Sequence, residues 1–178
     1  MNIEKFERQK TSEQMLKQYD AEFSDKQDIT LSDLSEMKEK GLSTEMFLDF
    51  LGKKYGYLFH GSRNDIPFTE QIKSSKGGEV FVSSSSSIAI LKALYRNNAK
   101  NLGYPLNLTE NNSNLTLIID GPQRDTIGER GYVYIISDTG SFEKDLSSNW
   151  QYSSKTDVTF LKRVQVEKND FKYPVEIK

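Results

Sequence analysis

The sequence predicts an α+β protein in which helices come first and an antiparallel-rich sheet follows. Apolar residues recur at helical spacing before Gly56, and short aromatic and β-branched runs separated by turn residues come after it. The composition supports one core and leaves part of the chain solvated, because 35% of the 178 residues are hydrophobic.

Residues 1–40 are the predicted solvated stretch, since they carry ten acidic and seven basic side chains. Their apolar residues form two stripes of helical spacing: Met15, Leu16, Tyr19 and Phe23, then Leu31, Leu34 and Met37. We therefore expect two short helices, the second ending at Gly41. The charge density further predicts an appendage with little apolar surface to bury.

A third helix is expected between Ser43 and Gly56. Ser43 is a favourable N-cap, Glu45 suits the first turn, and Gly56 can end the helix. Its apolar face consists of Met46, Phe47, Phe50 and Leu51. That face is wide enough for the helix to pack on the domain that follows.

Strands are expected in five short segments after Gly56: 57–59, 80–82, 115–119, 132–136 and 158–166. The serines from Ser83 to Ser87 stand between the second strand and an apolar run, which predicts a strand exit and a helix cap. The helix that follows should extend to about Lys100.

Composition and motifs exclude several classes of protein. With no cysteine and the single histidine His60, neither a thiolate nucleophile nor a cysteine- or histidine-rich metal site is expected. The 24 basic and 26 acidic residues nearly balance, which removes a global attraction to nucleic acid or to an anionic membrane. No long apolar run occurs and charges begin at Glu4, so we expect no membrane span, no signal peptide and a cytoplasmic location.

His60 is the first candidate for chemistry, because it follows an apolar strand and precedes Gly61-Ser62. The residues alone leave two interpretations open: a structural hydrogen-bonding histidine, or a binding or catalytic group at a cleft. A serine hydrolase is disfavoured because no Gly-x-Ser-x-Gly elbow occurs. A phosphate-binding loop and a dinucleotide-binding glycine fingerprint are absent as well.

Three separated motifs resemble the ADP-ribosyltransferase-like fold, in its poly(ADP-ribose) polymerase and diphtheria-toxin branch. They are Tyr57-Leu58-Phe59-His60-Gly61-Ser62, then Gly78-Glu79-Val80-Phe81-Val82-Ser83 with Ile88-Ala89-Ile90, then Trp150-Gln151-Tyr152-Ser153. Small bacterial proteins with the same His-Gly-Ser motif are similar. The resemblance covers residues 55–174 and implies a split sheet around a cleft. Residues 1–54 are then a charged helical segment before a domain at 55–178.

The resemblance implies roles for four residues in binding NAD. His60 would hydrogen-bond a ribose hydroxyl on the nicotinamide side, and Gly61 would offer its backbone to the nicotinamide amide. Ser62 matches the small hydroxyl residue beside them. Phe81 would offer a ring face to the cofactor, although a place in the core is an equal interpretation.

Two departures from the family pattern bear on catalysis. Ile90 or Leu91 stands where the family has a tyrosine that stacks on nicotinamide, and Gln151 matches the catalytic glutamate. Glutamine keeps a hydrogen bond to ribose but lacks the negative charge that favours an oxocarbenium-like transition state. A solvated strand position is the other interpretation of Gln151, and Glu143 and Glu129 are nearby alternatives for the charge.

A related branch transfers a 2′-phosphate from RNA to NAD, and it requires two histidines, which this chain lacks. Five cations remain as phosphate contacts or as a solvated surface: Lys92, Arg96, Lys100, Arg124 and Arg130.

The resemblance therefore implies an NAD-binding ADP-ribosyltransferase-like protein that cleaves the nicotinamide–ribose bond and transfers ADP-ribose to an acceptor. The expected partners are NAD and a macromolecular acceptor, protein or nucleic acid, with no membrane. The alternative is a non-enzymatic module of the same fold that binds NAD, ADP-ribose or a protein or nucleic-acid partner.

Overall fold

The computed structural model describes residues 3–74, 78–94, 102–103, 117–119, 128–138 and 140–177, and these ranges form an α+β fold as predicted. The helices are α1 (Ile3–Glu22), α2 (Leu31–Glu39), α3 (Thr44–Tyr55) and α4 (Ser86–Leu94). The strands of the main sheet are β1 (Asp28–Ile29), β2 (Leu58–Ser62), β3 (Val80–Ser83), β6 (Arg130–Ile136), β7 (Glu143–Lys144), β8 (Gln151–Ser154) and β9 (Lys162–Glu167). Three further strands pair with one another: β4 (Leu102–Gly103), β5 (Leu117–Ile119) and β10 (Val175–Ile177).

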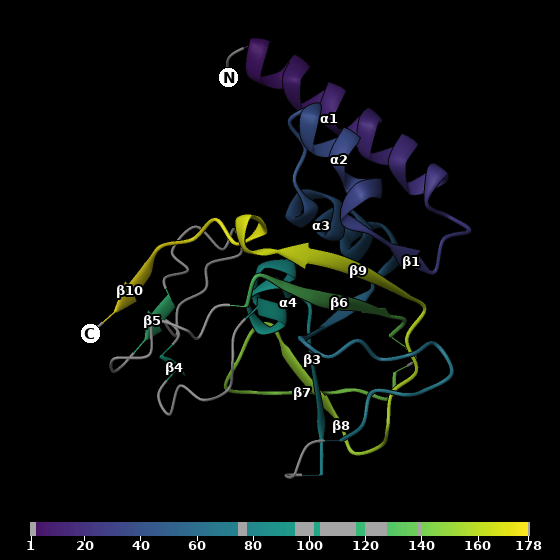
Figure 1. Ribbon diagram of the computed structural model, residues 1–178, viewed down its shortest axis with the longest axis vertical. Helices are drawn as coiled ribbons and strands as arrows, with labels where there is room; N and C mark the ends of the chain where they lie inside the picture. Colours follow the sequence, from purple (N-terminus) through teal and green to yellow (C-terminus); the bar gives the residue numbers. More distant parts are fainter. Residues whose placement is uncertain are drawn as a thin grey trace.

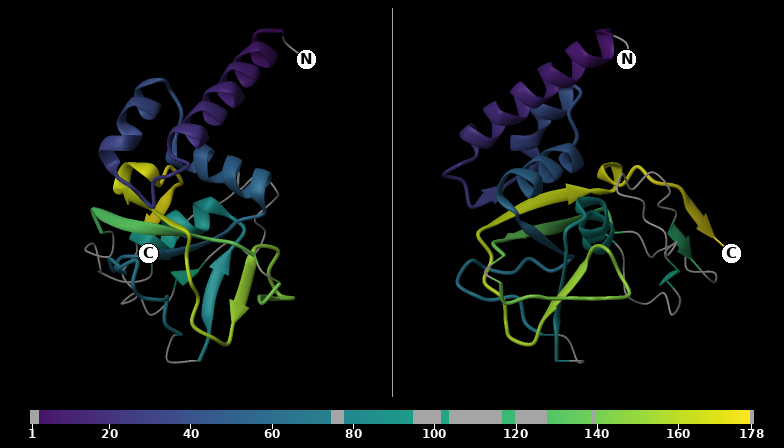
Figure 2. Two further views of the ribbon diagram at one scale, coloured as in Figure 1. Left: turned by 90° about the vertical axis from the view of Figure 1, so that its right-hand side faces the viewer. Right: turned by 180° about the vertical axis from the view of Figure 1, so that it is seen from behind.

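The main sheet is mixed and mostly antiparallel, with strand order β1-β9-β6-β2-β3-β8-β7. β1 is the exception, because it runs parallel to β9. Figures 1 and 2 show α1, α2 and α3 gathered at one end of the molecule, beside β9 and β6. These three helices therefore lie at one part of the sheet, away from β3, β8 and β7.

The caps of α2 and α3 explain where these helices begin and end. Thr30 and Asp33 form a reciprocal capping box at the start of α2. Ser43 accepts a hydrogen bond from the Met46 amide at 3.1 Å, and Gly56 ends α3 with φ +70°, a backbone conformation that favours glycine. The predicted third helix is confirmed, whereas α1 is longer than its short apolar stripe predicts.

The prediction that residues 1–40 bury little apolar surface is wrong. Their buried side chains belong to one cluster with α3, α4 and the sheet: Leu16, Tyr19, Phe23, Ile29, Leu34 and Met37. The charge count misleads because the charged side chains and the few apolar ones lie on different faces, and the apolar face packs completely. The predicted boundary at residue 54 stays a prediction, but the apolar cluster contains residues from both sides of it.

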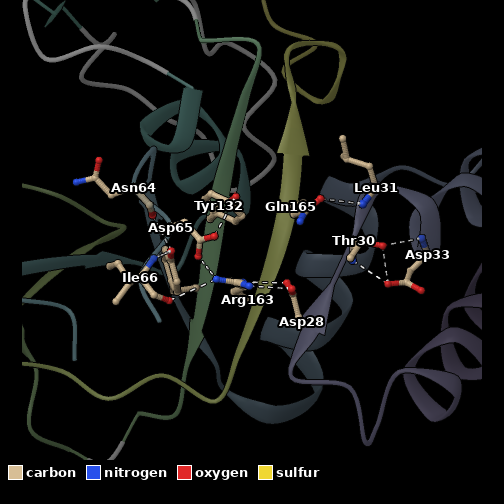
Figure 3. Close-up of polar contacts among 11 residues, drawn as sticks. Asp28, Thr30, Leu31, Asp33, Asn64, Asp65, Ile66, Tyr132, Arg163 and Gln165 are labelled. Carbon is tan, nitrogen blue, oxygen red and sulfur yellow. Dashed lines mark hydrogen bonds and ion pairs between the residues drawn. The ribbon is translucent and has the colours of Figure 1, made fainter. Parts of the chain in front are cut away.

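Polar contacts also join the N-terminal part to the sheet, as Figure 3 shows. The Arg163 guanidinium on β9 donates to both carboxylate oxygens of Asp28, at 2.9 and 2.8 Å, and forms an ion pair with Asp65. Gln165 accepts from the Leu31 amide at the start of α2. These bonds fix β1 against β9, a pairing that two residues of strand sequence did not predict.

Helix α4 lies unusually close to the sheet. A Cβ atom added at Gly61 would lie 1.9 Å from the Ala89 carbonyl oxygen, and one added at Gly131 would lie 2.0 Å from that of Ala93. Both glycines are therefore required by the contact of β2 and β6 with α4. Residues 95–100, where α4 was expected to continue, lie outside the described part of the chain.

The strands β2 and β3 pair at one position only, Phe59 with Ser83. By contrast, β2 pairs with β6 over five positions and β3 pairs with β8 over four. In Figure 1, β3 and β8 run steeply relative to β6 and β9. The sheet therefore opens between β2 and β3, just beyond their single pair.

Candidate functional site

A cavity of about 370 Å³ lies where β2 and β3 part. Its volume is near the lower end of the range for small-molecule sites, about 300–1,000 Å³. Its walls come from β2, β3, the start of β8 and one side of α4. The cavity brings together one or more residues from each of the three predicted motifs: His60, Gly61, Phe81 and Gln151.

His60 is half-buried, and its Nδ1 atom lies 2.7 Å from the carbonyl oxygen of Phe81. A carbonyl oxygen only accepts, so Nδ1 carries the proton of this hydrogen bond. Burial lowers the pKa of His60, and the Lys92 cation lowers it further. The imidazole is therefore neutral near pH 7, and Nε2 presents a lone pair.

Phe81 is 44% exposed, so its interpretation as a core residue is wrong. Its strand neighbours Val80 and Val82 are buried, as the alternation of a strand requires. The Phe81 ring lines the cavity, while its carbonyl holds His60. One residue thus supplies both an apolar face and the anchor of the histidine.

Gln151 is half-buried at the first position of β8. Its side-chain Nε2 donates to the Oδ2 of Asp145 at 3.1 Å. Its backbone carbonyl accepts from the backbone amide of Asp145 at 3.0 Å. Asp145 in turn accepts from the amide and hydroxyl of Ser147 at 2.8 and 2.6 Å. These two bonds lower the pKa of Asp145, so it is ionised at pH 7.

Sequence reasoning missed three charged groups at this site. Asp145 precedes Ser147 in an Asx-turn pattern, which predicts a turn but does not reveal its contact with Gln151. Glu79 and Lys73 line the cavity from the segments around the start of β3. Glu79 lies two residues before Phe81, so strand alternation was the available signal.

Some predicted residues lie elsewhere. Ser62 does not line the cavity, and its hydroxyl accepts from the Asn64 amide at 3.1 Å. Ile90 and Leu91 are buried in the cluster on the helical side, so they offer no surface for stacking. Glu143 and Glu129 also lie outside the cavity lining and approach Lys155 and Lys168.

The candidate cations divide into three groups. Lys92 on α4 lines the cavity, and its charge acts on His60. Arg130 begins β6 as an exposed residue and does not line the cavity. The three others lie outside the described residues: Arg96, Lys100 and Arg124.

The chain matches no protein-family model, no curated protein and no solved structure. Within the described ranges, no helix is both long and apolar enough to cross a membrane. The same ranges contain no group of three or more histidine, aspartate or glutamate side chains placed to hold a metal ion.

Proposed function

We propose that this chain is an ADP-ribosyltransferase-like protein that binds NAD in the cavity between β2 and β3. It cleaves the nicotinamide–ribose bond and transfers ADP-ribose to a macromolecular acceptor, protein or nucleic acid. One observation carries the proposal: residues of three motifs far apart in the sequence line one cavity. The single pair of Cα partners between β2 and β3 supports the split sheet that the resemblance implies.

Each residue contributes to binding through its own chemistry. The lone pair on His60 Nε2 accepts from a ribose hydroxyl, because Nδ1 is engaged by Phe81. The exposed Phe81 ring offers an apolar face to nicotinamide. Lys92 attracts the phosphates from the α4 side of the cavity. Gly61 lines the same cavity with its backbone, beside α4.

Cleavage breaks the bond between ribose C1′ and the nicotinamide nitrogen, and nicotinamide leaves with the electron pair. The sugar becomes oxocarbenium-like until a nucleophile of the acceptor bonds to C1′ and gives up its proton. Among the described lining residues, Glu79 supplies a carboxylate that can stabilise this cation. Gln151 holds the sugar without adding charge.

A non-enzymatic module that binds NAD or ADP-ribose is the second candidate. The observation that favours it is the amide of Gln151, which is neutral where the resemblance implies a glutamate. Binding alone requires only the hydrogen bonds and the ring face, and it needs no stabilisation of a cation.

Calorimetric titration with NAD, together with release of nicotinamide from labelled NAD, tests the proposal. We expect His60→Ala to weaken NAD binding by about tenfold or more, the scale of a lost buried hydrogen bond. The matched control Ser62→Ala, which changes a residue outside the cavity, should bind like the wild type. Glu79→Gln should slow nicotinamide release and leave the affinity nearly unchanged.

Each result assigns the protein to one class. Binding together with nicotinamide release supports the transferase, whereas binding without release with every acceptor tried supports the module. A folded wild-type protein that binds neither NAD nor ADP-ribose would overturn both.

A further inference from the structure

The two neutral polar side chains of the cavity that bind sugar in the proposed function share one feature. Each holds one polar atom against the protein and leaves its other polar atom without a partner among the described residues. His60 uses Nδ1 on the Phe81 carbonyl, and Gln151 uses Nε2 on the Asp145 carboxylate. The atoms left over are Nε2 of His60 and Oε1 of Gln151.

The nature of the anchors decides what the remaining atoms can do. A carbonyl and a carboxylate accept hydrogen bonds, so each anchor consumes a donor. A neutral imidazole has one N–H, and His60 has used it on Phe81. The amide of Gln151 has turned its NH₂ group toward Asp145, which is not a cavity-lining residue, and this leaves the oxygen as the free atom on a residue that lines the cavity.

Asp145 is held firmly enough to impose this orientation. The backbone amide and the hydroxyl of Ser147 both donate to Oδ1 of Asp145. The backbone amide of Asp145 donates to the backbone carbonyl of Gln151. The Ser148 hydroxyl accepts from the backbone N–H of Gln151 at 3.1 Å, which holds the same turn from its other end. A flipped Gln151 amide would point its oxygen at the carboxylate, and the repulsion between two acceptors disfavours that state.

We propose that Asp145 is the positioning residue of this site, and that it restricts the ligand to a sugar with free hydroxyl groups. By holding the Gln151 side-chain amide, Asp145 makes Gln151 present an acceptor. Phe81 does the same for His60, so the ligand must supply the donors at both positions. A ribose with unsubstituted hydroxyls meets this requirement, and a deoxy or phosphorylated ribose leaves an acceptor of the cavity without a donor from the ligand. The proposal rests on the proposed function, which takes NAD as the ligand and places a ribose at His60 and Gln151.

The test measures discrimination between hydroxylated and deoxy ligands. The probes are NAD and two series of NAD analogues that lack hydroxyls on the nicotinamide-side ribose or on the adenosine-side ribose. We expect the wild type to bind at least one series about tenfold more weakly than NAD, which corresponds to about 1.4 kcal/mol. Equal affinity for NAD and for every analogue would overturn the inference and leave the proposed function standing.

Variants of Asp145 separate positioning from a general structural role. Asp145→Ala and Asp145→Asn should both reduce the discrimination by about threefold, because the released Gln151 side chain can turn to another partner when the ligand lacks a hydroxyl. The contribution of His60, which Phe81 holds, should remain. Asp145→Asn keeps an acceptor for Ser147, so it guards against misfolding of the turn. Glu143→Gln removes a carboxylate charge on β7, outside the cavity lining, and is the matched control. It should keep the wild-type ratio of affinities for NAD and its deoxy analogues.

An exchange of donor and acceptor gives a rescue. The double variant Asp145→Asn/Gln151→Glu keeps one hydrogen bond between the two positions and again presents only oxygen to the cavity. It should restore discrimination to at least the wild-type ratio. If the two single variants at Asp145 fold and keep the wild-type ratio, Asp145 has no positioning role. If the wild type binds no NAD at all, the proposed function fails and this inference fails with it.

Discussion

The N-terminal helical layer and the cavity treat buried polar groups in opposite ways. In the helical layer the charged groups are paired, although the buried Tyr19 hydroxyl has no hydrogen-bond partner among the described residues. Arg163 donates to both carboxylate oxygens of Asp28, and Asp170 accepts from Thr44 at 2.7 Å and pairs with Lys38 at 3.0 Å. In the cavity, His60 and Gln151 each keep one polar atom open. Paired groups stabilise a fold, whereas anchored groups with an open atom are prepared for a ligand.

This difference separates two kinds of test. Variants in the helical layer should change the free energy of unfolding, and variants in the cavity should change ligand affinity or turnover. A cavity variant that mainly unfolds the protein, or a helical variant that mainly alters binding, would break the comparison.

The largest effect is expected from deletion of residues 1–40. The deletion removes six buried apolar side chains from the core, each worth about 1.5–3 kcal/mol. Their sum reaches or exceeds the whole stability of a typical domain, about 5–15 kcal/mol. The truncated chain should therefore lack a cooperative thermal transition, measured by circular dichroism.

A point variant makes the same test quantitative. Phe23→Ala should cost about 3–5 kcal/mol in urea unfolding, because the Phe23 ring is buried against Phe47. Lys17→Ala on the exposed side of α1 should stay within about 0.5 kcal/mol. A stable, cooperative truncated chain would restore the view of residues 1–40 as an appendage.

The second effect concerns the contact between β2 and α4. Gly61→Ala places a methyl group 1.9 Å from the Ala89 carbonyl, so the helix must shift. We expect a loss of about 3 kcal/mol, the upper part of the range for overpacked cores. Chemical denaturation measures it, and Ser62→Ala on the next residue should cost much less.

Gly131→Ala should resemble Gly61→Ala, because it meets the same helix at Ala93. Since one shift of α4 relieves both contacts, the double variant should cost less than the sum of the two single ones. If the losses of unfolding free energy simply add in the double variant, a single shift of α4 does not relieve both contacts.

The helices were largely predictable because their signals are local, whereas the expected strand segments correspond only to β2, β3, β5, β6 and β9. Ser43 and Gly56 carry cap chemistry in the sequence, and α3 lies between them. The strand β1 was not predictable, because Asp28 and Ile29 pair only through contacts with β9, far along the chain. The burial of Tyr19 and Phe23 was also missed, because total charge says nothing about which face each charge occupies.

The candidate site was predictable only in part. The resemblance selected His60, Phe81 and Gln151, and these lie at one cavity. It assigned Gly61 to close approach by a ligand, whereas the structure shows a close approach by α4. Asp145 could not be predicted because its role depends on a side-chain contact across a turn.

The third effect is on catalysis at Gln151. Gln151→Glu alone puts a carboxylate next to that of Asp145, and the repulsion should raise the pKa of one of them and blunt any gain. In the double variant Asp145→Asn/Gln151→Glu the new carboxylate has a donor instead. Nicotinamide release should then rise about tenfold over the wild type, or about 1.4 kcal/mol in transition-state stabilisation.

The comparison between these two variants is the control. Equal rates for the single and the double variant would mean that Asp145 does not act on residue 151. A rise in neither, with NAD still bound, would favour the binding module.

The smallest effect is the pH dependence that His60 gives to stability. Its pKa in the folded protein is lowered from the ordinary value of 6.5, so the unfolded chain takes up a proton first as the pH falls. Stability should therefore decrease as the pH falls from about 6.5 toward the lowered value. The charged groups around the cavity are Lys92 on α4, with Lys73 and Glu79 near β3, and the ring of Tyr134 on β6 lies beside the imidazole.

His60→Asn should remove this decrease, because asparagine can donate to the Phe81 carbonyl and does not titrate. The measurement is the free energy of urea unfolding of both proteins from about pH 8 to about pH 5. The effect is small because the imidazole is partly exposed and solvent screens its charge.

NAD should enlarge the pH dependence of the unfolding free energy, since a protonated Nε2 can no longer accept from a ribose hydroxyl. If the free energy of unfolding changes with pH by the same amount with and without NAD, the Nε2 atom of His60 does not contact the ligand.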